Sequence, residues 1–110
     1  IEEKEATFES APVGMIGLES CFGAVNKVLD MPLKELMKLS TVNPRRVMGF
    51  EADLFKIGCA AELTILDPDQ EWIYKEQNIY SKSRNTPFIG EKLKGKVRYT
   101  ISKGTIADLN

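Results

Sequence analysis

Histidine is absent from this 110-residue sequence. Its absence excludes Ser–His and Cys–His nucleophile pairs, and it removes the commonest general acid–base and the commonest zinc ligand. Long apolar runs are absent as well, since none approaches the roughly 20 residues that span a bilayer. Residues 1–5 have neither the basic nor the apolar region of a signal peptide. Taken alone, the chain is a poor candidate for a self-contained enzyme, and no membrane partner is expected.

The sequence also has no excess of charge of either sign, and it contains only two cysteines. Lys and Arg total 15 against 16 Asp and Glu, which gives a net charge of −1. This balance offers no electrostatic reason to expect nucleic acid or an anionic membrane surface as a partner. Cys21 and Cys59 have no CxxC spacing and no histidine nearby, so a zinc site is not expected. We interpret them as two reduced structural thiols of a cytosolic protein.

Hydrophobic periodicity in the first half of the chain predicts helices. From Ile16 on, apolar side chains recur on one face over three turns, and Gly17 and Gly23 are expected to leave room for close packing against a neighbouring element. A second helix is predicted over 33–39, and a third over 43–49 with Asn43 as its N-cap. The apolar face of the first helix consists of Leu18, Cys21, Phe22, Val25, Val28 and Leu29.

Strand signals dominate the second half. Two short strands are predicted over 63–66 and 71–74, separated by a turn cluster at 67–69. A hairpin is predicted over 97–109, with the two-residue loop at 103–104. Three or four short strands do not close a barrel, so further strands from elsewhere in the protein would be needed to bury both faces.

Two charged groups are candidate sites. The acidic group could hold a hard cation, but it lacks the spacing of a cation-binding loop, so a solvated chain end is favoured. The basic group could contact nucleic acid, but it lacks a convincing aromatic pattern and a net basic balance, so a solvated strand edge is favoured. The acidic group is Glu2, Glu3, Glu5 and Glu9, and the basic group is Lys92, Lys94, Lys96 and Arg98.

Four segments, in order and with matching spacing, resemble dihydroorotases of the amidohydrolase superfamily. They are APVGMIGLE at 11–19, TVNPRRV at 41–47, AELTILDPDQEW at 61–72 and SKSRNTPFIG at 81–90. Allantoinases and hydantoinases share parts of this pattern and stay open as alternatives. The NTPF stretch in the fourth segment favours dihydroorotase among these cyclic amidohydrolases.

The resemblance implies that the chain is the C-terminal piece of a longer α/β protein, and its start at Ile1 rather than Met fits that expectation. Residues 1–50 would be the last loop and helices of a TIM-like (β/α)8 metal-dependent hydrolase barrel. Residues 51–110 would be C-terminal strands of the flanking composite β-sandwich. The chain by itself is predicted to be α+β. The zinc ligands and the catalytic Asp would lie upstream of Ile1, so the chain would hold no catalytic or metal residue and be inactive alone.

The resemblance also implies a reaction and a substrate-binding segment. Dihydroorotases reversibly cyclise N-carbamoyl-L-aspartate to L-dihydroorotate in de novo pyrimidine biosynthesis, with a zinc-activated hydroxide and an Asp proton shuttle. The family residues that match Ala11, Pro12 and Gly14 help to hold the dihydroorotate ring, largely through backbone groups. Val13 stands where Ser is common in the family. If that side chain contributes to binding, the affinity for substrate would differ from that of the family.

Expected partners follow from the same resemblance. The parent protein would be a cytoplasmic homodimer that binds a small-molecule substrate, with aspartate transcarbamoylase as a candidate partner. A non-catalytic dihydroorotase-like scaffold for aspartate transcarbamoylase is one alternative. A free-standing α+β interaction module that uses the Val97, Tyr99 and Ile101 face is another. The isolated chain is predicted to be marginally stable, because helices built to pack on barrel strands would expose apolar faces.

Overall fold

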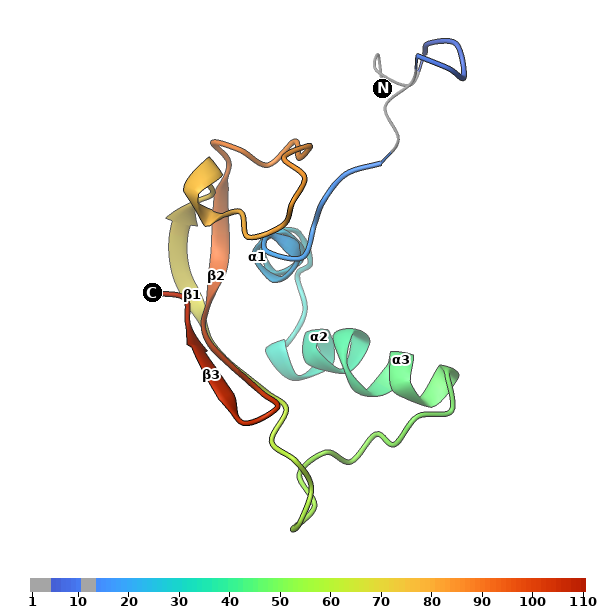
Figure 1. Ribbon diagram of the computed structural model, residues 1–110, viewed down its shortest axis with the longest axis vertical. Coiled ribbons are helices and arrows are strands. Elements are labelled where there is room, and N and C mark those ends of the chain that lie inside the picture. The colour runs from blue at the N-terminus through green and yellow to red at the C-terminus, as the bar shows by residue number, and fades with distance from the viewer. Residues whose placement is uncertain (1–4, 11–13) are drawn as a thin grey trace.

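The computed structural model describes residues 5–10 and 14–110. Three helices precede three strands, which confirms the predicted α+β character, and in Figure 1 the helices form one layer beside the curved sheet. The elements are α1 (Cys21–Val28), α2 (Leu33–Ser40), α3 (Val42–Val47), β1 (Leu63–Ile73), the 3-10 turn η2 (Glu76–Asn78), β2 (Lys92–Ser102) and β3 (Thr105–Asp108).

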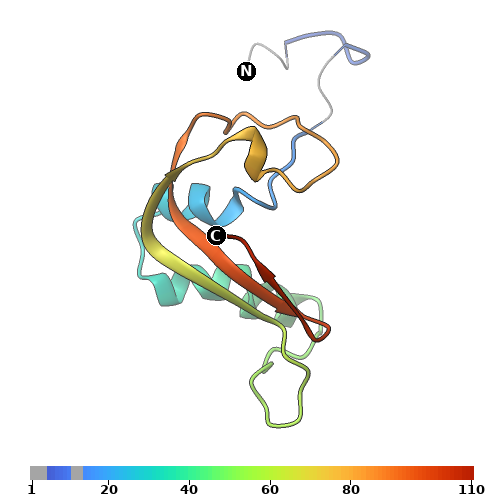
Figure 2. The ribbon, with the colours of Figure 1, turned by 60° about the vertical axis from the view of Figure 1, so that its left-hand side comes forward.

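The sheet is antiparallel in the order β1-β2-β3. The prediction of two strands separated by a turn at 67–69 is wrong, because β1 runs unbroken from Leu63 to Ile73. The turn residues form a bulge inside it, where the pairing with β2 shifts between Asp67 and Glu71. The Asp67 carboxylate accepts hydrogen bonds from the backbone N–H groups of Asp69 and Gln70, a local Asx turn that an edge strand accommodates. Figure 2 shows the resulting curvature of β1 and β2.

The predicted hairpin is confirmed. Ser102 pairs with Thr105, and the two loop residues, Lys103 and Gly104, have φ values of 49° and 74°. Positive φ at both positions is typical of a type I′ turn, whose twist matches that of the flanking strands. The strand that returns is β3, which pairs with β2 only from Tyr99 to Ser102.

Helix α1 packs on β2 with Gly23 in close approach and with Phe22 and Asn26 beside Gly95. The prediction that the helix starts near Ile16 is wrong, because the chain up to Leu18 is not helical and α1 begins at Cys21. The predicted apolar face is only partly covered: Phe22 and Val25 are half-buried, whereas Leu18 is 89% exposed and Val28 is 76% exposed. Gly23 is buried, and its missing side chain lets the helix backbone approach the sheet. The close packing expected at Gly17 is wrong, because a Cβ there would meet no described atom within 4 Å.

The second and third helices differ in how well they follow the sequence pattern. Helix α2 lies where it was predicted, with Leu36 fully buried. In α3, the prediction that Asn43 is the N-cap is wrong, because the helix begins at Val42 and Thr41 occupies the cap. Only Thr41 separates α2 from α3, and its hydroxyl donates to Met37 O in α2. Gly49, with a φ of 72°, ends the segment as predicted.

The described core is small. Tyr74, Ile79 and Leu93 are buried together, and Ile16, Ala24, Trp72 and Phe88 pack against them. The chain exposes 8669 Å², against about 6,100 Å² expected for a compact monomer of 12.3 kDa. Much of the apolar surface of the helices is therefore open. Within residues 5–10 and 14–110, no helix has the length and apolar character needed to cross a bilayer.

Candidate functional site

Of the three residues predicted to bind substrate, the structure describes one. Ala11 and Pro12 lie outside the described residues, and Gly14 lies inside them. Gly14 is exposed and has a φ of +80°. A Cβ built on it would meet no described atom within 4 Å, so the backbone conformation and not lack of space favours glycine here.

Asn85 holds Gly14 from the fourth motif segment. The Asn85 Nδ2 donates to Gly14 O at 2.9 Å, and the Ile16 N–H donates to Asn85 O at 3.0 Å. The Ser83 hydroxyl bonds to Asn85 Oδ1. Because a carbonyl oxygen can only accept a hydrogen bond, the amide nitrogen is the end of Asn85 that faces Gly14 O. The segment at 14–16 is therefore tied to a residue about 70 positions further along the chain.

We call the hydrogen bonds of Asn85 to Gly14 and Ile16 the first tie. Glu19 makes a second tie, a further set of hydrogen bonds between the first and fourth motif segments. One carboxylate oxygen, Oε1, accepts from Tyr80 N at 3.0 Å, Ser81 N at 2.7 Å and Ser81 Oγ at 2.7 Å. The other oxygen, Oε2, is buried without a partner among the described residues. Burial is the largest single influence on the pKa of Glu19 and raises it, but the Ser81 and Tyr80 hydrogen bonds together outweigh burial, so this pKa lies below 4.5.

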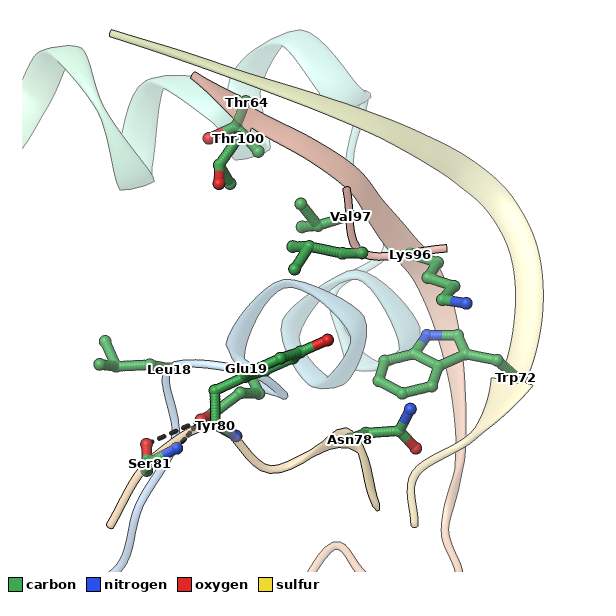
Figure 3. A pocket seen from close by; sticks show the side chains of 11 residues that line it. Leu18, Glu19, Thr64, Trp72, Asn78, Tyr80, Ser81, Lys96, Val97 and Thr100 are labelled. Atoms are coloured by element: carbon green, nitrogen blue, oxygen red, sulfur yellow. Dashed lines mark hydrogen bonds between the residues drawn. The ribbon is translucent and has the colours of Figure 1, made fainter. Parts of the chain in front are cut away.

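A hollow of about 570 Å³ lies beside Glu19, between the second tie and the sheet. Its walls include Trp72 and Lys96 from the strands and Tyr80 from the connection before β2 (Figure 3). The Lys96 ammonium lies 6.0 Å from the Trp72 ring centroid. The hollow combines aromatic walls with one carboxylate and one ammonium, so it offers contacts for packing rather than a nucleophile–base pair.

Helix α1 is fixed on the sheet by two polar contacts, and the segment at 14–19 leads directly into it. Asn26 Nδ2 donates to Pro68 O and to Lys94 O, both at 2.9 Å. Trp72 Nε1 donates to Gly95 O at 2.9 Å, next to the point where α1 approaches β2. These contacts satisfy carbonyls that the bulge in β1 and the Gly95 conformation remove from the regular ladder.

The ties were not predicted from the sequence, although all of their residues lie in or beside two quoted motif segments. Glu19 and Gly14 belong to the first segment, and Ser81 and Asn85 belong to the fourth. The only signal available was membership of those two segments in one family pattern. Nothing in the spacing indicated that the two segments touch.

The described residues do not fit a zinc ion. No three His, Cys, Asp or Glu side chains within residues 5–10 and 14–110 gather in an arrangement that could bind a metal. Cys21 and Cys59 are both exposed free thiols, in separate parts of the fold. Any zinc expected from the resemblance would need ligands other than these side chains.

Comparison with known proteins identifies the family. A sequence model of the amidohydrolase family matches residues 11–107. The chain belongs to the amidohydrolase family. Both motif segments that form the ties lie entirely within the matched residues of this amidohydrolase chain, and the resemblance inferred from the four segments is confirmed.

Individual relatives narrow the likeness within the amidohydrolases. The chain is 48% identical over 98 residues to a protein of Chlorobaculum tepidum named Dihydroorotase, covering 86% of this chain and 22% of the relative. It is 43% identical over 105 residues to the Dihydroorotase of Aquifex aeolicus, covering 93% and 25% respectively. It is 38% identical over 109 residues to that of Clostridium acetobutylicum, covering 96% and 26%. The chain thus spans about a quarter of the length of these relatives.

Proposed function

We propose that this chain forms part of a dihydroorotase and supplies the substrate-side segment that ends at Gly14. The observation that carries the proposal is the 38–48% identity, over most of the chain, to relatives named Dihydroorotase. The reaction would be the reversible cyclisation of N-carbamoyl-L-aspartate to L-dihydroorotate. The placement of residues 1–50 in a (β/α)8 barrel and of 51–110 in a β-sandwich is part of the same proposal.

The role proposed for this chain is binding and not proton transfer. A glycine in the left-handed region leaves the backbone bare, so the edge of a planar amide ring can approach it closely. Ala11 and Pro12 would complete the contact through backbone groups. The described residues offer no zinc ligand set, so no step through zinc is assigned to them, and zinc is assigned to other residues of the protein. The proposed location is the cytoplasm, with a homodimeric parent and aspartate transcarbamoylase as candidate partner.

Turnover by the gene product that contains this sequence tests the proposal. L-dihydroorotate, hydantoin and allantoin are supplied separately, and ring opening is followed by the loss of amide absorbance. We expect L-dihydroorotate to have the highest kcat/KM by at least about a hundredfold, since a site built to pair the carboxylate on its ring rejects hydantoin and allantoin, which have ring amides but no carboxylate. Preference for hydantoin or allantoin would contradict the dihydroorotase assignment. A well-folded protein with no turnover of any of the three would favour the scaffold alternative.

A further inference from the structure

We propose that Asn85 and Glu19 are positioning residues that fix the substrate-side segment at 14–19 onto the segment at 80–85. Asn85 acts on Gly14 itself, and Glu19 anchors the other end. The proposal rests on the proposed function for its kinetic consequence. The ties themselves are hydrogen bonds between residues 61 to 71 positions apart.

The first tie fixes both a position and an orientation. Gly14 O accepts from the Asn85 side chain, and the Ile16 N–H donates to the Asn85 backbone. Together the two bonds straddle Met15 and hold three consecutive residues against one partner. The Gly14 carbonyl, which can only accept, requires the nitrogen end of the Asn85 amide, and the Ser83 hydroxyl bonds to the other end. A position held by two bonds with a fixed donor is pre-organised for a ligand.

The second tie holds the far end of the segment. Glu19 accepts three hydrogen bonds on one oxygen from two consecutive residues, Tyr80 and Ser81. Hydrogen bonds to an ionised acceptor are roughly twice as strong as neutral ones. Between the ties, Ile16 packs on the core cluster. The segment at 14–19 is therefore bonded at both ends and packed in its middle.

The partner segment is itself held by the rest of the fold, so it can serve as a support. Arg84 Nη1 donates to Glu76 O at 2.9 Å. The Gly90 N–H donates to Tyr74 O at 2.8 Å, and the Tyr74 N–H donates to Glu91 O at 3.0 Å. Tyr74 is one of the buried core residues. The segment at 80–85 is thus an exposed connection that is bonded to Glu76 and continues to Gly90 and Glu91, which pair with the buried Tyr74.

Loss of a tie has a specific kinetic consequence. A freed segment must be ordered again each time substrate binds, which lowers affinity without touching the reacting atoms. A general loss of folded protein instead lowers the apparent kcat and leaves KM unchanged. A rise in KM at nearly constant kcat therefore separates a positioning role from a merely structural one.

The decisive variant is Asn85→Asp, with Asn26→Asp as its matched control, both made in the gene product that contains this sequence. Each replaces an amide donor to a backbone carbonyl by a carboxylate of the same shape, but Asn26 bonds Pro68 and Lys94 and not the substrate segment. We expect Asn85→Asp to raise the KM for L-dihydroorotate about tenfold with kcat changed by less than about threefold. Asn26→Asp should lower the melting temperature and leave KM unchanged. Equal KM effects in both variants, or none in Asn85→Asp, would overturn the proposal.

A second pair tests the Glu19 tie by rescue. Glu19→Gln keeps an oxygen that can accept from Tyr80 and Ser81, whereas Glu19→Ala removes it. We expect Glu19→Ala to raise KM and Glu19→Gln to restore it to within about threefold of wild type. A Glu19→Gln variant as impaired in KM as Glu19→Ala would overturn the proposal for this residue.

Hydrogen exchange keeps the ties testable apart from the reaction. The Ile16 amide is bonded to Asn85 O, so its exchange should accelerate in Asn85→Asp and not in Asn26→Asp. If the wild type turns over none of the tested rings while Ile16 exchange responds as stated, the proposed function fails and the positioning of Gly14 stands. If exchange at Ile16 is the same in wild type and Asn85→Asp, the positioning proposal fails whatever the activity.

Discussion

Gly23 of α1 lies so close to Leu93 of β2 that a Cβ on the glycine would be 3.0 Å from the Leu93 Cβ. The same Cβ would lie 3.1 Å from the Gly95 carbonyl oxygen. This contact sets how near the helix can come to the sheet, and with it where the segment at 14–19 enters the helix. The approach would be closed by any side chain, because one of the two neighbours is backbone and cannot rotate away.

Gly23→Ala should therefore destabilise the protein despite alanine's better helix propensity. The propensity gain of up to about 1 kcal/mol is outweighed by overpacking, for a net loss of about 1–2 kcal/mol. Urea unfolding followed by circular dichroism measures the change. Gly17→Ala is the control, since a Cβ there meets no described atom within 4 Å, and this change should leave the free energy of unfolding the same or raise it by up to about 1 kcal/mol. Equal effects at the two glycines would contradict the packing account.

Trp72→Phe should remove one hydrogen bond and keep most of the packing. The indole N–H donates to Gly95 O at 2.9 Å. The indole ring packs edge-to-face on the Tyr74 ring, with the two ring centroids 5.7 Å apart. We expect a loss of about 1 kcal/mol, the net value of one such bond. Tyr80→Phe, at an exposed ring, serves as the control and should lie within about 0.5 kcal/mol of wild type. A neutral Trp72→Phe would show that the indole bond to the Gly95 carbonyl is not stabilising.

Local sequence signals predicted much of the fold, and the predictions that were wrong have a common cause. Helix α2 and the hairpin at Lys103–Gly104 were predicted because propensity and turn chemistry act over a few residues. The α1 start and its buried face were predicted wrongly, because periodicity identifies an apolar face but not the neighbour that covers it. Asp67–Asp69 was predicted as a turn between two strands, since an Asx turn has the same local signal whether it ends a strand or forms a bulge within it.

Part of the candidate site was likewise predicted from the sequence, and part of it was not. Gly14 was reached through the family resemblance, and its positive φ agrees with the need for glycine. The ties of Gly14 to Asn85 and of Glu19 to Ser81 could not be predicted, because contacts across 62 or 71 positions leave no trace in one sequence. They depend on the fold, which brings the two motif segments side by side. Whether Gly14, Ala11 and Pro12 bind substrate stays a prediction.

Acid should weaken the Glu19 tie. The pKa of Glu19 in the fold lies below its ordinary value of 4.5, where burial raises it but the hydrogen bonds from Ser81 and Tyr80 prevail. A depressed pKa contributes stability that is complete above the unfolded value and is lost as pH falls through the folded one. Wild type should therefore melt higher than Glu19→Gln at pH 7, and the gap should close below about pH 4.5. A gap that stays constant down to about pH 3 would contradict this pKa direction.

The isolated 110-residue chain should associate or unfold without a sharp transition. It exposes roughly 2,600 Å² more surface than a compact monomer of its mass, and its exposed side chains include Leu18, Val28 and Val47. Sedimentation velocity should reveal species larger than a monomer, and calorimetry a broad transition. A monomer with a cooperative two-state melt would instead favour the free-standing interaction module.

The most direct test of the central claim, that the segment at Gly14 faces substrate while tied to Asn85, is hydrogen–deuterium exchange with ligand. The gene product that contains this sequence is compared with and without saturating L-dihydroorotate, and β3 at Thr105–Asp108 provides the internal reference. The account predicts slower exchange at residues 14–19, unchanged exchange in β3, and loss of that protection in Asn85→Asp at the same ligand concentration. Unchanged exchange at residues 14–19 in a protein shown to bind the ligand would contradict it.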